Sequence, residues 1–215
     1  MPGIAKLNVK EFQNRILRFD ESYVTDWRWW VNSLNDQREV ADCFGRVLRR
    51  WQACRPNRMR RARNEARHEQ PYLEDLIAES NQHIWALQSF DIRLPASFTH
   101  QARESLEQLW DVFRGLSYHG QTRNGLAGVV GISKAVLLLS EGRVGPAFDS
   151  EVRRQLEIQA PENAPEWIDA LQVVSRDIHA FERANQCSLQ KAVPVRFAGI
   201  HSGRIYDMAL GPGKK

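Results

Sequence analysis

The sequence predicts an all-α protein, built as one globular body with two helical lobes. Apolar residues recur at intervals of three and four over most of the chain, which is the spacing of one face of an amphipathic helix. No convincing run of alternating apolar and polar residues predicts a β-strand, and glycine, proline and capping residues separate the apolar segments. We expect an N-terminal lobe in residues 1–95 and a hairpin-containing lobe in residues 96–215, within a single globular unit.

Each expected helix follows from its own apolar pattern and from the residues that end it. Ser97 is expected to cap the most regular helix, Pro56 stops an earlier one, and residues 161–165 are expected to form a loop. The expected helices cover residues 9–19, 36–53, 97–116, 132–139 and 166–184, with shorter helices after Pro71, after Asp149 and in the tail 193–210.

Three tryptophans close to the N-terminus have two interpretations. Trp27, Trp29 and Trp30 lie beside Arg28, and such a cluster could be a stacking platform for bases or sugars. The alternative is an aromatic anchor in the core, which is the more ordinary use of tryptophan.

Composition favours a polyanionic partner and excludes several other classes. The 215 residues carry a net charge of +4, and the isoelectric point is about 9.1. The three cysteines are widely spaced, so one chain cannot build a four-cysteine zinc or iron–sulfur cluster. The histidines form no H-E-x-x-H or H-x-H pattern, so we expect no metal and no other cofactor.

The same composition predicts a soluble protein. No stretch approaches about 20 apolar residues, the length that a membrane span needs. The N-terminus has no apolar run of signal-peptide length, and scattered cysteines fit reduced thiols. We therefore expect a cytoplasmic monomer with no membrane partner.

The most informative stretch runs from Arg123 to Leu156. Three glycines within residues 125–131 predict a sharp turn that can approach another surface closely. The helix that follows is apolar on nearly every face, and the first amides of a helix attract anions. The turn therefore predicts a phosphate site, to which Ser133 and Lys134 could add a hydroxyl and a cation.

A carboxylate follows this helix at a position that predicts two different roles. Asp149 comes directly after Gly145-Pro146 and Phe148, and it precedes a short helical segment. Its simplest role is that of an N-cap. A carboxylate beside a phosphate-binding turn could also activate water and stabilise positive charge on a sugar ring.

This arrangement resembles the helix-hairpin-helix DNA glycosylase superfamily. The family pattern is an L-P-G-V-G hairpin, a buried helix and an aspartate that opens the next helix; residues 126–131, 135–139 and 149–152 correspond to it. The resemblance is confined to residues 123–157. It implies a two-lobed helical fold, DNA as the partner, a target nucleotide flipped out of the duplex, and Asp149 facing its deoxyribose.

The sequence departs from the family pattern at several positions. Ala127 replaces the hairpin proline, Val130 is an inserted residue, and the spacing to the aspartate is short. Aligned on the second hairpin glycine, Ser133 rather than Lys134 occupies the position of the Schiff-base lysine of lyases. This alignment favours a monofunctional glycosylase, although a shift of one residue would make Lys134 the amine.

These patterns together assign candidate site residues. Asp149 and Lys134 are the candidate catalytic residues. The candidate phosphate ligands are Gly128, Val130, Gly131, Ser133, Lys134 and Arg123; the candidate base pocket is Tyr118, His119 and Asn124.

An arginine cluster is the strongest basic feature of the chain. Six arginines within residues 55–67 are opposed by Glu65 alone, and guanidinium groups suit phosphate oxygens. Such a run can equally be a solvated helix face. The residues expected to contact the duplex are Arg58, Arg60, Arg61 and Arg63.

The function expected first is hydrolysis of the N-glycosidic bond of a damaged or modified base, which could be a modified base of foreign DNA. Two alternatives remain open. One is a non-catalytic helical DNA-binding protein with the same hairpin. The other follows from Arg63 and His68, which fit R-N-x-x-x-H and resemble the motif of metal-independent HEPN ribonucleases.

Overall fold

The computed structural model describes residues 3–34, 40–51, 73–116 and 126–213, and it confirms the all-α class. Ten α-helices lie within these ranges, and the described residues form no β-strand. The nearest approach to one is an isolated antiparallel bridge between Phe19 and Gly213.

The helices are separated by connections of very different lengths. Two 3₁₀ turns, Pro95–Ser97 and Val195–Phe197, join them. The α-helices are α1 Val9–Arg18, α2 Glu21–Ser33, α3 Val40–Arg50, α4 Leu73–Ala86, α5 His100–Arg114, α6 Val129–Leu139, α7 Ser150–Leu156, α8 Ala164–Asn185, α9 Leu189–Ala192 and α10 Ser202–Leu210.

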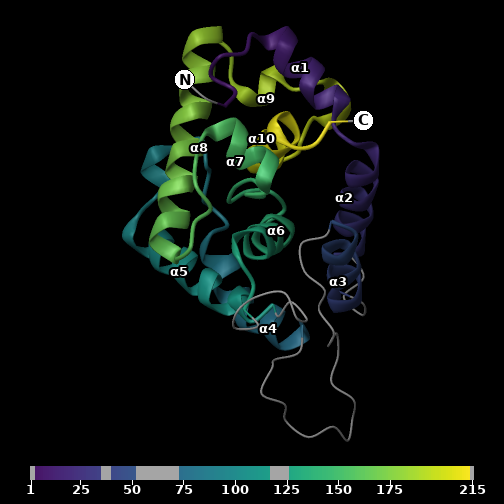
Figure 1. Ribbon diagram of the computed structural model, residues 1–215, viewed down its shortest axis with the longest axis vertical. Coiled ribbons are helices and arrows are strands. Elements are labelled where there is room, and N and C mark those ends of the chain that lie inside the picture. The colour runs from purple at the N-terminus through teal and green to yellow at the C-terminus, as the bar shows by residue number, and fades with distance from the viewer. Residues whose placement is uncertain (1–2, 35–39, 52–72, 117–125, 214–215) are drawn as a thin grey trace, which may run out of the picture.

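Helix α6 lies at the centre of the fold. In Figure 1, α5 and α8 lie on one side of α6, and α2 and α3 lie on the other. Residues 131–138 of α6 are all buried, because the helix packs against both α5 and α3. The Trp30 indole N–H donates to the Leu138 carbonyl over 2.9 Å and so joins α2 to α6. The sequence prediction of a helix buried nearly all round is thus confirmed.

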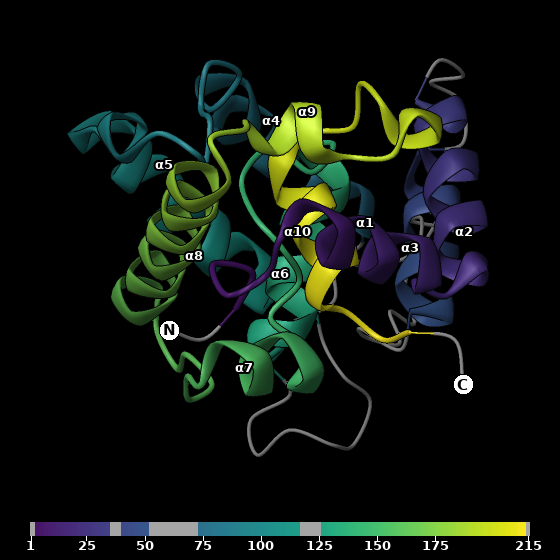
Figure 2. The ribbon, with the colours of Figure 1, turned by 90° about the horizontal axis from the view of Figure 1, so that it is seen from above.

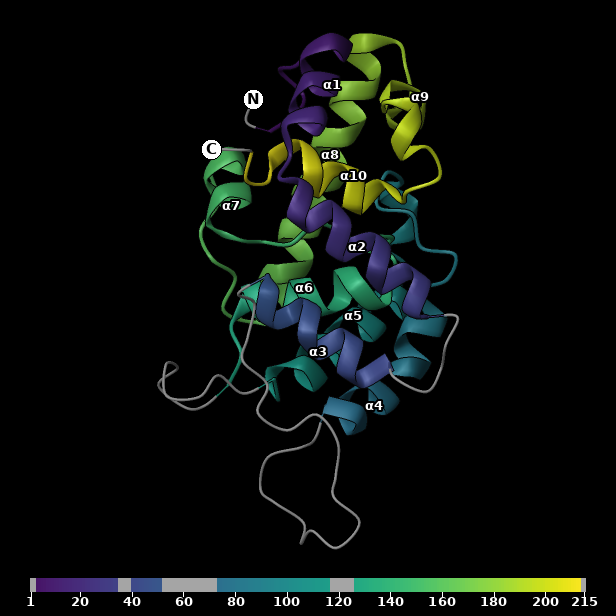
Figure 3. The ribbon, with the colours of Figure 1, turned by 90° about the vertical axis from the view of Figure 1, so that its right-hand side faces the viewer.

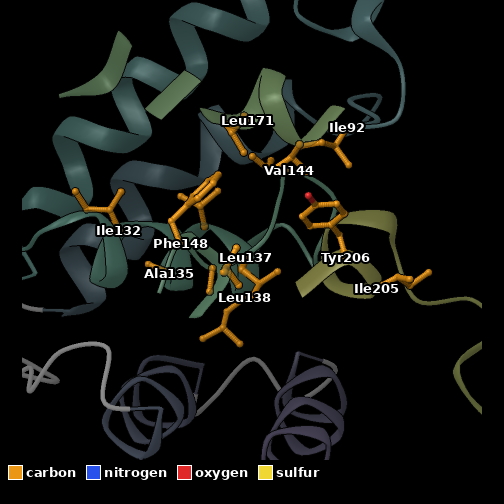
Figure 4. Packing of buried hydrophobic residues seen from close by; sticks show 14 of the residues in the cluster. Ile92, Ile132, Ala135, Leu137, Leu138, Val144, Phe148, Leu171, Ile205 and Tyr206 are labelled. Carbon is orange, nitrogen blue, oxygen red and sulfur yellow. The ribbon is translucent and has the colours of Figure 1, made fainter. Parts of the chain in front are cut away.

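A single apolar core contains residues from both predicted lobes. Its members extend from Ile4 to Leu210, and α1 packs against α9 and α10 near the other end of the chain. Figure 4 shows Phe148 and Leu171 together with Ile132 of α6 inside this core. The predicted lobe boundary near residue 95 stays a prediction.

Asp177 fixes the N-terminal segment to the core. Its carboxylate accepts hydrogen bonds from the Ile4 amide at 2.7 Å, the Ala5 amide at 3.1 Å and the Tyr206 hydroxyl at 2.6 Å. Burial raises the pKa of Asp177, although these hydrogen bonds act in the opposite direction. The preceding Gly3 has φ +80°, and a Cβ there would collide with this carboxylate. The hydrogen bonds to the Asp177 carboxylate therefore hold the N-terminal segment, α8 and α10 together.

Two predicted helix starts are wrong by a few residues. Helix α5 begins at His100 with Thr99 as its N-cap, because the Ser97 hydroxyl instead accepts a hydrogen bond from the Asp91 amide. Helix α8 begins at Ala164, with Asn163 as N-cap, inside the segment that was expected to be a loop. A proline is tolerated in the first turn of a helix, where its missing N–H has no intrahelical partner.

The tryptophan cluster divides between core and surface. Trp27 and Trp30 are buried, which agrees with the interpretation as aromatic core anchors. Trp29 is 39% exposed on the outer face of α2.

Helix α10 meets the turn after α6 at backbone contact. The Arg204 amide donates to the Gly142 carbonyl over 3.1 Å. A Cβ at Gly203 would lie 2.6 Å from that carbonyl oxygen and 2.7 Å from the backbone of Gly145. Only glycine therefore permits this close approach of the two segments.

We predict that Gly203→Ala lowers the free energy of unfolding by about 1–3 kcal/mol, because the new methyl group overpacks against backbone that cannot rotate away. Urea unfolding measures the difference. Gly213→Ala is the matched control, since a Cβ there would lie 3.5 Å from the Arg18 carbonyl oxygen, an ordinary contact. Equal stability of the two variants would contradict the close packing of α10.

Candidate active-site cleft

Asp149 is the N-cap of α7, as its sequence position predicts. Its Oδ1 atom accepts hydrogen bonds from the Glu151 and Val152 amides, each at 3.0 Å. The side chain is half-buried. The capping role uses one oxygen of the carboxylate, which leaves Oδ2 for other contacts.

The two residues before Asp149 are held from different helices. The Phe148 amide donates to Ser133 Oγ of α6 over 2.9 Å. The Ala147 amide donates to Asp207 Oδ1 of α10 over 3.0 Å. The backbone that carries Asp149 is therefore fixed between α6 and α10, and Figure 3 shows α7 beside α10.

Asp149 and Lys134 line the same cleft, although they belong to different elements. Its aromatic wall includes Tyr23 and Trp51. The rest of the lining is the buried pair Arg204 and Asp207, with Phe19, Ala147 and Pro212. The cleft has a volume of about 10 Å³, which is room for about one water molecule. The opposite charges of Lys134 and Asp149 in the lining of one narrow cleft make this the candidate active site.

Lys134 is 6% exposed, and its ammonium group points into the protein. Its Nζ atom donates a hydrogen bond to the Trp51 carbonyl oxygen over 2.6 Å. This bond joins the middle of α6 to the end of the α3 segment. It also holds the amine at the cleft.

Arg204 and Asp207 form a buried ion pair in the lining of the cleft. Arg204 Nη1 donates to Asp207 Oδ2, and Nη2 donates to the Tyr23 carbonyl oxygen over 3.2 Å. Burial raises the pKa of Asp207, which the positive charge of Arg204 opposes, and burial lowers the pKa of Arg204. The pKa of Tyr23 is raised by burial and by the negative charge of Asp149.

Aromatic rings surround the Arg204 guanidinium. Its central carbon lies 5.1 Å from the ring centre of Phe19 and 4.9 Å from those of Trp27 and Trp51. Ring faces attract a cation at these distances, which offsets part of its desolvation. The guanidinium is therefore a structural cation that is 1% exposed.

No sequence pattern assigned Arg204, Tyr23 or Trp51 to a site. Asp207, from its position near the C-terminus, could be a second carboxylate of the site or, more simply, a cap or a surface charge. One signal was present. Arg204 and Asp207 are three residues apart in an otherwise apolar helix, and that spacing places two side chains on one face. An opposite-charge pair on the buried face of a helix is the pattern that identifies them.

The expected glycine turn is shorter than predicted. Gly128 is the N-cap of α6, so Val130 and Gly131 already lie inside the helix. The Gly131 and Ile132 amides donate to the Gly128 carbonyl at 3.0 and 3.2 Å. The amides available to an anion are therefore those of Val129 and Val130. Gly125, at the start of the predicted turn, lies outside the described residues, and the Ala127 amide donates to the Arg114 carbonyl over 2.9 Å. A helix-hairpin-helix element therefore stays a prediction.

Ser133 and Lys134 do not face solvent at this helix start. Ser133 is 2% exposed, and its hydroxyl is bound to the Phe148 amide. In this structure both side chains are engaged inside the protein, so they reach no surface phosphate. The tertiary packing of α6 instead places Ser133 against the loop before Asp149 and Lys134 at the cleft.

Several candidate residues lie outside the described part of the chain. This group holds Arg58, Arg60, Arg61, Arg63, His68, Tyr118, His119, Arg123 and Asn124. The duplex contacts, the base pocket and the R-N-x-x-x-H motif therefore stay predictions.

Within residues 3–34, 40–51, 73–116 and 126–213, no group of three or more His, Cys, Asp or Glu side chains could hold a metal ion. Over the same ranges, no helix is long and apolar enough to cross a membrane. Comparisons with protein-family models, with curated proteins and with solved structures give no significant match. Function is therefore inferred from the geometry of the cleft.

We predict that Asp207→Ala lowers the free energy of unfolding by about 3–5 kcal/mol, because it leaves the buried Arg204 guanidinium without its counter-ion. Urea unfolding followed by tryptophan fluorescence measures the loss. Arg154→Ala removes a solvent-exposed ion pair with Glu151 and should change stability little.

The double variant Arg204→Met, Asp207→Leu separates two contributions to the free energy of unfolding: the penalty for burying one unpaired charge and the net contribution of the intact ion pair. It should recover much of the stability that Asp207→Ala loses, because no unpaired charge stays buried. If Asp207→Ala were as stable as Arg154→Ala, the ion pair would not be a structural element of the cleft.

Proposed function

We propose that the protein is a DNA glycosylase that hydrolyses the N-glycosidic bond of a damaged or modified base. The observation that carries this proposal is the convergence of Asp149 and Lys134 on one cleft. Both are candidate residues from the sequence, and they come from different elements: Lys134 from the middle of α6 and Asp149 from the N-cap of α7. If the sequence resemblance were due to chance, nothing would require the Asp149 and Lys134 side chains to line the same cleft.

Asp149 supplies the central chemistry in this proposal. As a carboxylate it would stabilise the positive charge that develops on the deoxyribose when the base departs, and it would orient water toward C1′. Its Oδ1 atom is bound by two amides, and the residues before it are bound by Ser133 and Asp207. A carboxylate held this firmly loses little freedom when the substrate arrives.

The aromatic wall supports a role in receiving an extruded nucleotide. The Tyr23 and Trp51 rings lie 5.7 Å apart and are tilted by 45°. Flipped-out bases are held by stacking against such side chains. Because the cleft has room for about one water molecule, the entry of a base requires the wall to move apart.

Lys134 acts as an electrostatic partner in this proposal. Its amine is buried and bound to the Trp51 carbonyl, so we propose that water rather than Lys134 attacks C1′. The enzyme would then be monofunctional, leaving an intact abasic strand.

DNA is the proposed partner, and the start of α6 is the proposed anchor for its backbone. Gly128 is exposed at this helix start, and the Val129 and Val130 amides follow it. A helix N-terminus attracts phosphate through such amides and through its dipole. The net charge of +4 agrees with a polyanionic partner.

We predict that Asp149→Asn lowers the rate of base release by a factor of about 10² to 10⁴ and leaves DNA binding within a few-fold of the wild type. Asparagine is as good an N-cap as aspartate, so the variant keeps α7 and changes only the charge. The assay incubates the protein with duplexes that carry a panel of modified bases and scores abasic sites.

Glu157→Gln is the control, because it removes a carboxylate at the other end of α7. It should retain the wild-type rate. Full activity of Asp149→Asn would rule out the glycosylase mechanism. DNA binding without base release by the wild type across the panel would favour the non-catalytic alternative.

A second prediction concerns whether the Lys134 amine forms a covalent Schiff base with the DNA. Treatment of an active reaction with borohydride should trap no covalent protein–DNA complex, and the product strand should stay uncut until alkali is added. Borohydride reduces a Schiff base irreversibly, so a lyase intermediate would be captured. A trapped complex that disappears in Lys134→Gln would show instead that Lys134 is the nucleophile.

A further inference from the structure

A second cavity lies on the other side of α10, and its lining is rich in hydrogen-bond donors. It has a volume of about 190 Å³ and is formed by the segment after α4, the turn after α6, α9 and the start of α10. Arg143, His201, Ser202 and Gln88 are among its lining residues. In Figures 2 and 3, α9 lies on one side of α10 and α7 lies on the other, so this cavity is separate from the cleft at Asp149.

The Arg143 guanidinium supplies the net charge of the cavity. Among the described residues it forms no ion pair with a carboxylate. Its Nη2 atom forms a hydrogen bond with the His201 Nε2 atom over 3.4 Å. The acidic group of the cavity, Asp91, is already neutralised. Its two oxygens accept three side-chain hydrogen bonds from Arg93 at 2.5 to 3.1 Å. The cavity therefore carries one positive charge that nothing in its described lining cancels.

His201 adds a neutral donor. Burial lowers the pKa of His201, and the positive charge of Arg143 lowers it further. Because the guanidinium can only donate, Nε2 of the neutral ring must be the acceptor of the Arg143 contact. The ring proton then resides on Nδ1, which is a hydrogen-bond donor.

Ser202 adds another donor at the first position of α10. The residue is 5% exposed, and its Oγ atom accepts a hydrogen bond from the side-chain Nε2 of Gln190 over 3.1 Å. A hydroxyl carries one proton of its own, and no acceptor for that proton is assigned among the described residues. Buried polar groups of this kind normally have partners, so the hydroxyl is available to a ligand.

We propose that this cavity binds a phosphate group. A guanidinium, a neutral imidazole N–H and a buried hydroxyl match the several acceptor oxygens of a small tetrahedral anion, and the helix start adds its dipole. The phosphate could be inorganic phosphate or the 5′-phosphate of a nucleotide, and the cavity chemistry is the same for both. The site does not depend on the proposed glycosylase activity, because it shares no lining residue with the cleft.

Isothermal titration of the full chain with inorganic phosphate, and separately with a nucleoside 5′-monophosphate, tests the proposal at constant ionic strength. Saturable one-to-one binding of at least one of them is expected. Arg143→Gln should weaken that binding about ten- to a hundredfold, since a hydrogen bond from a charged group is removed. Tighter binding of the monophosphate would identify a nucleotide as the ligand.

Arg176→Gln is the matched control, because it makes the same charge change at an exposed position of α8. It should bind phosphate as the wild type does. His201→Asn serves as a second variant in case Arg143→Gln is poorly folded, and circular dichroism checks the fold of each. The proposal is overturned if neither probe binds saturably at about 10 mM, or if Arg176→Gln weakens binding as much as Arg143→Gln.

Discussion

The buried ion pair between Arg204 and Asp207 is the constraint on which the centre of the molecule depends. Removing two charges from water costs several kcal/mol each, and that cost is recovered only when every partner is in place. Here the partners are the Tyr23 carbonyl, the Ala147 amide and a set of aromatic ring faces. They come from α2, from the loop before α7 and from the end of α3. These segments therefore stabilise the buried pair together with α10, because leaving any one of them out would remove a hydrogen bond or a ring face from it.

This constraint also explains how a carboxylate becomes available at the cleft. Asp149 sits at the end of a loop whose backbone is bound to Asp207 on one side and to Ser133 on the other. The same packing turns Lys134 inward, toward the Trp51 carbonyl. A rigid frame of this kind holds side chains in place without further ordering, which is a property that catalytic sites require. In the proposed mechanism, the narrow cleft would admit a nucleotide only if the aromatic wall moved, because it has room for about one water molecule.

Helix α10 lies between the cleft and the donor-rich cavity and contributes to the lining of both. Its Arg204 and Asp207 side chains face the cleft, and Ser202, two residues before Arg204, lines the donor-rich cavity. Residues two apart in a helix project in nearly opposite directions. Between them, Gly203 allows the helix to touch the turn after α6. Helix α10 thus presents an ion pair to the cleft and hydrogen-bond donors to the cavity.

The sequence by itself determined the helical class, the buried character of α6 and the N-cap position of Asp149. These follow from periodicity and capping chemistry, which are local and need no knowledge of distant residues. Only the tertiary structure decided that the glycine turn ends at Gly128, that Ser133 binds the loop before α7, and that Asp207 is buried rather than at the surface. From the sequence alone, an aspartate such as Asp207 could equally be exposed to water or be paired with a buried arginine that aromatic rings surround. Which of the two it meets depends on segments far away in the chain, because burial and ion pairing are properties of the assembled core.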